Sequence, residues 1–207
     1  MVFNQAFDII NMLVRELKKR KFGMEVFLVY SANKSLLSKM IQFYTKETYN
    51  HVSISLDKEL VSTYSFGRKK MSNPLIGGFV QEDFWDPFFL TSECAIYSLD
   101  ITEKEYNKLL SLIEFFEKNK ALFKYNFIGL LALSLQYNLE RENAYFCSEF
   151  IATLLSESDV TSFDKENQFI TPQDLLELHG LEKIYEGDMF HYLTKENMRE
   201  TLNVSAI

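Results

Sequence analysis

Cysteine, proline and tryptophan are scarce in this chain of 207 residues, which has two, three and one of them. The two cysteines, Cys94 and Cys147, cannot build the disulfide framework of a small secreted domain, so we expect a reducing compartment. The apolar run FIGLLALSL (127–135) is far shorter than the roughly 20 residues that a membrane-spanning helix needs. We therefore expect a cytoplasmic protein.

A signal peptide is also missing from the start of the chain, MVFNQAFDIINMLVRELKKRKFG. Its charges follow its apolar residues, and no small-residue cleavage site is present. Apolar residues recur there at helical spacing, which predicts an amphipathic helix over residues 1–22 that caps the domain. The KKRK run beside this apolar face leaves attachment to a membrane surface as an alternative, and we favour a helix that packs on the domain.

Positive charge is neither abundant nor clustered. The formal net charge is −7 and the Lys and Arg residues are scattered, which argues against a nucleic-acid partner. The histidines and cysteines do not have the spacing of metal ligands, so we expect no metal and no cofactor. The run Arg68-Lys69-Lys70 is typical of a solvated turn.

What the chain does have is a succession of short strand and helix patterns. In HVSIS (51–55), Val52 and Ile54 alternate with polar residues, which predicts a strand with one apolar and one polar face. Further strands are predicted at 25–30, 60–66 and 94–100, helices at 34–45, 102–119, 124–139 and 147–158, a long loop at 67–93 and a closing hairpin at 182–193 with Gly187 in its turn. Thr102 followed by Glu105 predicts a capping box at the start of the helix at 102–119, and Thr171 followed by Pro172 predicts the start of a further helix. One α+β domain over 1–207 accounts for this order, with a core over 24–193 and a C-terminal tail at 194–207.

Cys147 stands where an apolar run changes into an amphipathic helix. Phe150, Ile151, Leu154 and Leu155 form the buried stripe of this helix, and Cys147 lies at its start. Unpaired N–H groups and the positive end of the helix dipole favour a thiolate there. The alternative is a small buried residue, which is the reading that we give to Cys94.

A nucleophilic cysteine needs a base, and the chain has three histidines. His179 precedes a glycine at an apparent helix end, and His191 lies in the expected hairpin. His51 instead opens a strand whose polar face also carries Ser53 and Ser55. This pattern favours His51 as the partner of Cys147.

The blocks NHVSISLD, YSFGRK, GGF, YFCSEF and TPQDL follow one another in that order. In this order and separation they resemble the permuted papain-like amidases, the YiiX/YebB-like branch of the NlpC-type cysteine peptidase superfamily. The resemblance covers roughly residues 24–193. It implies a circularly permuted papain-like fold, in which a small antiparallel sheet or half-barrel packs against helices that include the nucleophile's helix.

The resemblance also implies roles for particular residues. Cys147 would be the nucleophile and His51 the base, and the residue that orients the imidazole would be Thr63, on the strand after the histidine. Ser65 lies on the same face as Thr63, and Glu82 is another candidate for the third role. We expect Tyr145, Ser65 and Glu82 to contact the substrate, with packing as the alternative for Tyr145.

The function implied is a cysteine hydrolase or amidase that cleaves amide bonds of a small peptide through a thioester. A lipid acyltransferase or thioesterase-like activity on an acyl substrate is the first alternative. A catalytically weak ligand-binding module on the same fold is the second, because a hydroxyl in the third role stabilises an imidazolium less than a carboxylate does. The sequence does not indicate an oligomeric state.

Overall fold

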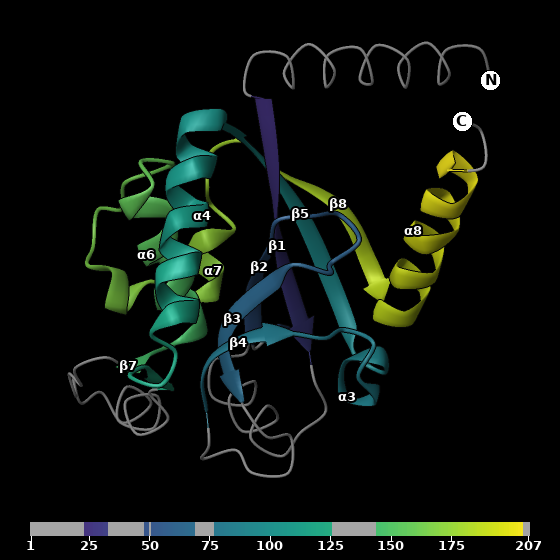
Figure 1. The fold of residues 1–207 in the computed structure, drawn as a ribbon, viewed down its shortest axis with the longest axis horizontal. Helices are drawn as coiled ribbons and strands as arrows, with labels where there is room; N and C mark the ends of the chain where they lie inside the picture. Colours follow the sequence, from purple (N-terminus) through teal and green to yellow (C-terminus); the bar gives the residue numbers. More distant parts are fainter. Residues whose placement is uncertain (1–22, 33–47, 50, 69–76, 126–143, 205–207) are drawn as a thin grey trace.

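A computed structural model describes residues 23–32, 48–49, 51–68, 77–125 and 144–204 of the chain (Figure 1). The predicted helices at 1–22 and 34–45 lie outside these residues, as does most of the one at 124–139. Among the helices that are described, none combines the length and the apolar character needed to span a membrane.

The described residues form an α+β fold built around a six-stranded antiparallel sheet with the strand order β4-β3-β2-β1-β5-β8. The strands of this sheet are β1 (Gly23–Ala32), β2 (His51–Ser55), β3 (Thr63–Arg68), β4 (Gly77–Glu82), β5 (Glu93–Thr102) and β8 (Leu181–Asp188). The short strands β6 (Lys124–Tyr125) and β7 (Ala144–Tyr145) pair in parallel beside it.

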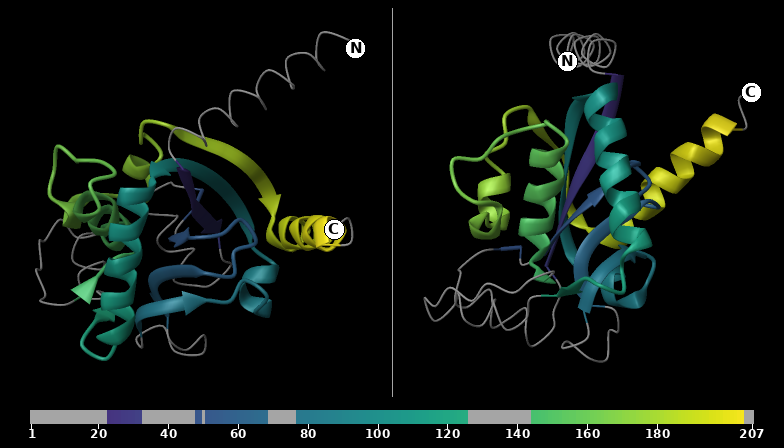
Figure 2. Two further views of the ribbon diagram at one scale, coloured as in Figure 1. Left: turned by 45° about the horizontal axis from the view of Figure 1, so that its top comes forward. Right: turned by 60° about the vertical axis from the view of Figure 1, so that its left-hand side comes forward.

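Helices cover both faces of the sheet, as the views in Figures 1 and 2 show. On one face lie α4 (Glu103–Lys118), α6 (Cys147–Glu157) and α7 (Pro172–Leu175), and on the other α3 (Pro87–Leu90) and α8 (Met189–Val204). Strand β1 is buried on both faces. Leu28 and Tyr30 pack in the core with the first set of helices, whereas Phe27 and Val29 pack in the core with the second set. Successive side chains of a strand point to opposite faces, so a strand covered on both sides is apolar throughout.

The first face holds an aromatic core. The ring of Phe66 lies 4.9 Å from that of Tyr145 and 5.1 Å from that of Phe150, between centroids, and it also contacts Phe79 and Phe116. These rings come from β3, β4, β7, α4 and α6. The cluster therefore fixes the start of α6 against the strands that follow β2.

Several local predictions are confirmed. Thr102 and Glu105 form the capping box at the start of α4, since the Glu105 carboxylate accepts from the Thr102 N–H at 2.7 Å and the Thr102 hydroxyl accepts from the Glu105 N–H at 3.3 Å. Pro172 occupies the first turn of α7, which Thr171 caps.

Two predictions about the chain's course are wrong. Residues 67–93 are not one loop, because they contain β4 and α3. The predicted hairpin at 182–193 consists of β8 followed by the start of α8, and this helix extends to Val204 through most of the predicted C-terminal tail.

Replacing Phe66 by Ala should remove the central ring of the aromatic core. We expect the free energy of unfolding to fall by about 3–5 kcal/mol, because buried aromatic side chains replaced by Ala leave a cavity as well as lost burial. Urea denaturation measures this change. Val61→Ala is the matched control: Val61 is 67% exposed and should change the value by less than about 0.5 kcal/mol. Equal losses in the two variants would contradict the assignment of the core.

Candidate functional site

Polar side chains gather on one face of β2, β3 and β4. In β2, His51, Ser53 and Ser55 alternate with Val52 and Ile54, which belong to the apolar core of the opposite face. In the antiparallel register Ser55 pairs with Thr63, and Thr63 pairs with Glu82, the last residue of β4. Residues paired in this way carry their side chains on the same face, so these strands place a histidine, several hydroxyls and a carboxylate together.

The imidazole of His51 contacts the carboxylate of Glu82. Its Nε2 lies 2.7 Å from Glu82 Oε1, and the side chains are only 12% and 4% exposed. Burial alone lowers the pKa of His51, but the Glu82 carboxylate and the hydrogen bond with Cys147 outweigh it and raise the pKa to about 10. The imidazole is therefore held as an imidazolium at neutral pH.

Two hydroxyls complete the surroundings of Glu82. Ser65 Oγ donates to Oε1 at 2.7 Å, and Ser53 Oγ donates to Oε2 at 2.5 Å. Burial raises the pKa of Glu82, but the charge and hydrogen bond of His51, together with both serines, hold it below its ordinary value. Glu82 is thus an anion paired with the His51 cation.

Cys147 is the first residue of α6, and it lies beside His51. The preceding residue, Phe146, is extended, and its N–H donates to the Glu149 carboxylate at 3.0 Å, which fixes the first turn of the helix. The thiol is almost completely buried. Burial raises the pKa of Cys147, but the hydrogen bond and charge of His51 lower it, as do the backbone N–H groups of Val52 and Ser148, so that the pKa lies below its ordinary value.

The backbone of β2 also contacts the Cys147 sulfur. The ladder between β2 and β3 comprises Ile54 with Tyr64 and Ser55 with Thr63, and Val52 lies beyond it. The Val52 N–H donates to the Cys147 sulfur. The strand that carries His51 therefore also binds the Cys147 sulfur, which sets the separation of the two side chains.

The two ring nitrogens of His51 have different partners. Nε2 lies 2.7 Å from Glu82 Oε1 and 3.3 Å from Ser53 Oγ, so Nδ1 is the nitrogen left for the hydrogen bond with the Cys147 sulfur. A thiolate, an imidazolium and a carboxylate joined by hydrogen bonds can supply a nucleophile, move a proton at Nδ1 and stabilise the charge that results.

The prediction that Thr63 orients the imidazole does not fit this geometry. Thr63 Oγ1 donates to Ser55 Oγ at 2.8 Å and lies 3.0 Å from the carbonyl oxygen of Leu60. Thr63 pairs with Ser55, four residues beyond His51 along β2, so its short side chain does not reach the ring. Glu82, the other candidate for the third role, occupies this place because its longer side chain extends back along the sheet.

The remaining site predictions are placed as follows. Ser65 and Glu82, expected at the substrate, are engaged with each other, and Tyr145 is half-buried in the aromatic core, the packing alternative. His179 and His191 are exposed. Cys94 lies on β5, buried on the face of the sheet opposite to α6, and burial raises its pKa to about 12.

Sequence reasoning did not assign roles to Ser53, Gly67 or the Val52 N–H. The alternation of β2 places Ser53 on the same face as His51, and this pattern could have identified Ser53 as a residue of the site. Gly67 lies against the same group: a Cβ built there would be 3.4 Å from Glu82 Oε1. No cluster of three potential metal ligands occurs within the described residues.

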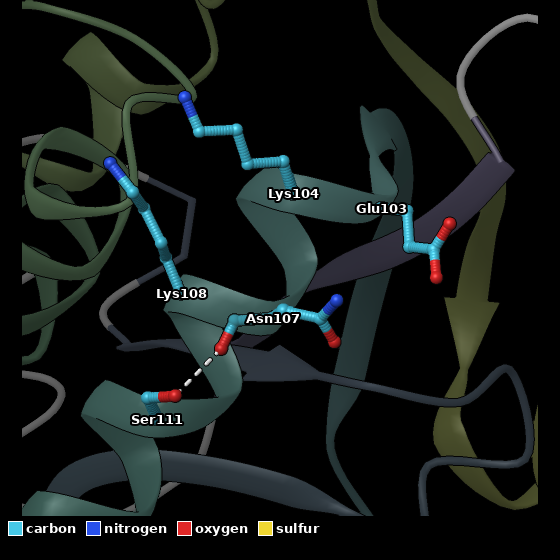
Figure 3. Close-up of a pocket in the computed structure, with 5 residues that line it drawn as sticks. All are labelled: Glu103, Lys104, Asn107, Lys108 and Ser111. Carbon is cyan, nitrogen blue, oxygen red and sulfur yellow. Dashed lines mark hydrogen bonds between the residues drawn. The ribbon is translucent and has the colours of Figure 1, made fainter.

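A separate shallow hollow lies on α4, away from these residues. It is lined by Glu103, Lys104, Asn107, Lys108 and Ser111 (Figure 3). Lys108 is paired with Asp159, and the Ser111 hydroxyl donates to the Asn107 carbonyl oxygen at 2.8 Å. These contacts are those of an exposed helix surface, so we assign it no chemistry.

Comparison with known proteins identifies no relative of this chain. No family model matches the chain, and no curated protein matches it.

The pH dependence of alkylation tests the state of the Cys147 thiol. With iodoacetamide and peptide mass spectrometry, we expect the rate at Cys147 to rise with a midpoint below the ordinary thiol value of 9.0. In His51→Ala the midpoint should move upward, because burial still raises the pKa of Cys147 and the opposing positive charge is gone.

Cys94→Ser is the control and should leave the midpoint unchanged. A wild-type midpoint at or above 9.0, or one that His51→Ala does not alter, would show that the two side chains are not coupled.

Proposed function

We propose that the protein is a cysteine hydrolase in which Cys147 is the nucleophile and His51 the acid–base group. The observation that carries this proposal is the hydrogen bond between Cys147 and His51, with Glu82 on the far side of the imidazole. A buried thiol whose pKa is lowered by a histidine, at the first position of a helix, has the features of an activated nucleophile.

The reaction begins with attack of the Cys147 sulfur on the carbonyl carbon of an amide. The carbonyl oxygen becomes an oxyanion, and the N–H of Cys147, one of those that a helix start leaves without an internal partner, is placed to donate to it. His51 gives its Nδ1 proton to the nitrogen of the leaving amine, the C–N bond breaks, and a thioester remains on Cys147.

Hydrolysis of the thioester completes the cycle. His51, now neutral, takes a proton from water, and the resulting hydroxide attacks the thioester carbon. The C–S bond breaks, the acid leaves, and the thiolate and imidazolium are restored. Glu82 does not exchange a proton in either step. Its negative charge stabilises the imidazolium, which favours the thiolate form of the resting enzyme.

The proposed fold is the permuted papain-like arrangement. Support comes from chain order, since the histidine strand β2 precedes the cysteine helix α6, and from the packing of α6 on β2 and β3 within an antiparallel sheet. The proposed substrate is the amide bond of a small peptide. The binding-module alternative depended on a hydroxyl beside His51, and the carboxylate of Glu82 in that position removes its motivation.

Turnover of N-acyl dipeptide p-nitroanilides, followed by release of p-nitroaniline, tests this proposal. We expect Cys147→Ala to reduce the rate to background. His51→Ala should lower kcat by about 10³-fold and Glu82→Gln by about 10²-fold, within the range that acid–base groups contribute. Cys94→Ser should retain the wild-type rate.

Mass spectrometry of the quenched reaction should find the acyl group on the peptide that contains Cys147. Hydrolysis of p-nitrophenyl fatty-acid esters with no amide turnover would favour the lipid acyl alternative. Wild-type turnover in Cys147→Ala would exclude the proposed mechanism.

A further inference from the structure

The Glu82 carboxylate is a buried anion that accepts from three donors among the described residues. Oε1 accepts from His51 Nε2 and Ser65 Oγ, both at 2.7 Å, and Oε2 accepts from Ser53 Oγ at 2.5 Å. An ionised carboxylate accepts at both oxygens, whereas a protonated one has to donate from one of them. Three convergent donors therefore favour the ionised form and fix the plane of the carboxylate.

Gly67 provides the space in which this arrangement fits. A Cβ at this position would lie 3.2 Å from Ser65 Oγ, 3.4 Å from Glu82 Oε1 and 3.6 Å from His51 Cε1. Only the first distance is shorter than an ordinary contact, so a methyl group would push on the Ser65 hydroxyl that donates to Glu82 and would lie in contact with the carboxylate and the imidazole. Glycine within a strand weakens the strand and often marks a close approach of other groups. Here the groups that approach are those of the proposed site.

The other groups around the carboxylate carry little competing charge. Among the described residues, His51 on β2 is the titratable group that faces Glu82, and Cys147 on α6 lies beyond the imidazole. From the side chains of β3 that the structure describes, the polar groups on this face are the hydroxyls of Thr63 and Ser65. On β1 the residue paired with His51 is Ser31, which is neutral. The neighbour in the chain, Asp83, is exposed and accepts from the Trp85 N–H.

We propose that Ser53, Ser65 and Gly67 form a socket that keeps Glu82 ionised and directed at His51, which makes them positioning residues. Their importance for turnover rests on the proposed function, in which Glu82 acts through His51. The socket itself is a property of the resting protein. It can therefore be measured without a substrate.

Titration of Glu82 tests the two serines. In protein labelled with [δ-¹³C]Glu, the Glu82 resonance is assigned as the one missing from Glu82→Gln, and its shift is followed with pH. In Ser53→Ala and in Ser65→Ala we expect the midpoint to move upward by about one pH unit, because each variant removes one hydrogen bond to the anion.

Ser55→Ala is the matched control. Ser55 is a fully buried serine on the same face of β2, but its hydroxyl donates to the Asp57 carbonyl oxygen and accepts from Thr63. Its loss should leave the Glu82 midpoint unchanged. An unchanged midpoint in both other variants, or an equal shift in Ser55→Ala, would overturn the proposal. If either Ala variant fails to fold, Ser53→Cys or Ser65→Cys replaces it. These variants keep nearly the same side-chain size with a weaker donor, so we expect the Glu82 midpoint to move upward by less than in the Ala variants.

Gly67→Ala tests the space. We expect the ¹H resonance of the His51 Nε2–H to lie downfield because of its hydrogen bond, and a shift of Ser65 that disturbs the Glu82 carboxylate should move it upfield. The melting temperature should stay near that of the wild type, since Ala is tolerated in a strand at least as well as Gly. An unchanged resonance in a folded Gly67→Ala variant would show that the position does not support the pair.

These experiments test the socket independently of the proposed function. Shifts at Glu82 and His51 in a protein without turnover would leave the socket in place and refute the hydrolase. Turnover that depends on Cys147, with no change at Glu82 in the serine variants, would support the hydrolase and refute the socket.

Discussion

The hydrogen bond between His51 and Glu82 is the interaction on which the proposed site depends. It joins the first residue of β2 to the last residue of β4, across the intervening strand β3, over 2.7 Å. Without the carboxylate, burial would lower the pKa of His51, and the imidazole would be neutral beside a buried thiol. The charge on Glu82 instead raises the pKa of His51, and the positively charged imidazolium in turn lowers the pKa of Cys147. Three buried ionisable groups thus stabilise one another.

The fold brings these groups together through two separate structural devices. The antiparallel register of β2, β3 and β4 sets the positions of His51 and Glu82. The aromatic core around Phe66 holds the start of α6 against β3 and β4, and the backbone N–H of Val52 then binds the Cys147 sulfur. The sheet face that carries the charge pair and the helix that carries the sulfur are therefore fixed by different contacts. A change in either set of contacts would separate the Cys147 sulfur from the His51 imidazole.

Local sequence patterns predicted the parts of this site that depend on short spacings. The alternation in HVSIS placed His51 on the polar face of a strand, and the apolar stripe after Cys147 placed it at a helix start. The partner of His51 could not be read in the same way, because Glu82 lies 31 residues away. Strand β4 was not predicted, because Gly77, Gly78, Pro74 and Pro87 suggested a loop and the apolar alternation within β4 is only a few residues long. The length of the Glu82 side chain then decides the contact, and Thr63 is too short to make it.

The end of the chain shows a different kind of error. Gly187 was interpreted as a hairpin turn, but β8 continues through it to Asp188, and α8 follows directly. The Asp188 carboxylate accepts from the His191 N–H at 3.0 Å, as an N-terminal cap does. Met189, Tyr192 and Leu193, at helical spacing, bury one side of α8 on the second face of the sheet. This helical spacing can be read in the sequence, but Gly187 was interpreted as a turn and the helix was not predicted.

The protonation state of His51 is the most direct measure of whether these groups are coupled. We expect ¹⁵N resonances of the imidazole to show both ring nitrogens protonated at about pH 8, because the pKa of His51 is raised to about 10. In Glu82→Gln the ring should lose its proton at a distinctly lower pH, since burial then acts with less opposition. A neutral His51 at about pH 8 in the wild type, or a titration that Glu82→Gln does not change, would contradict the central role given to this pair.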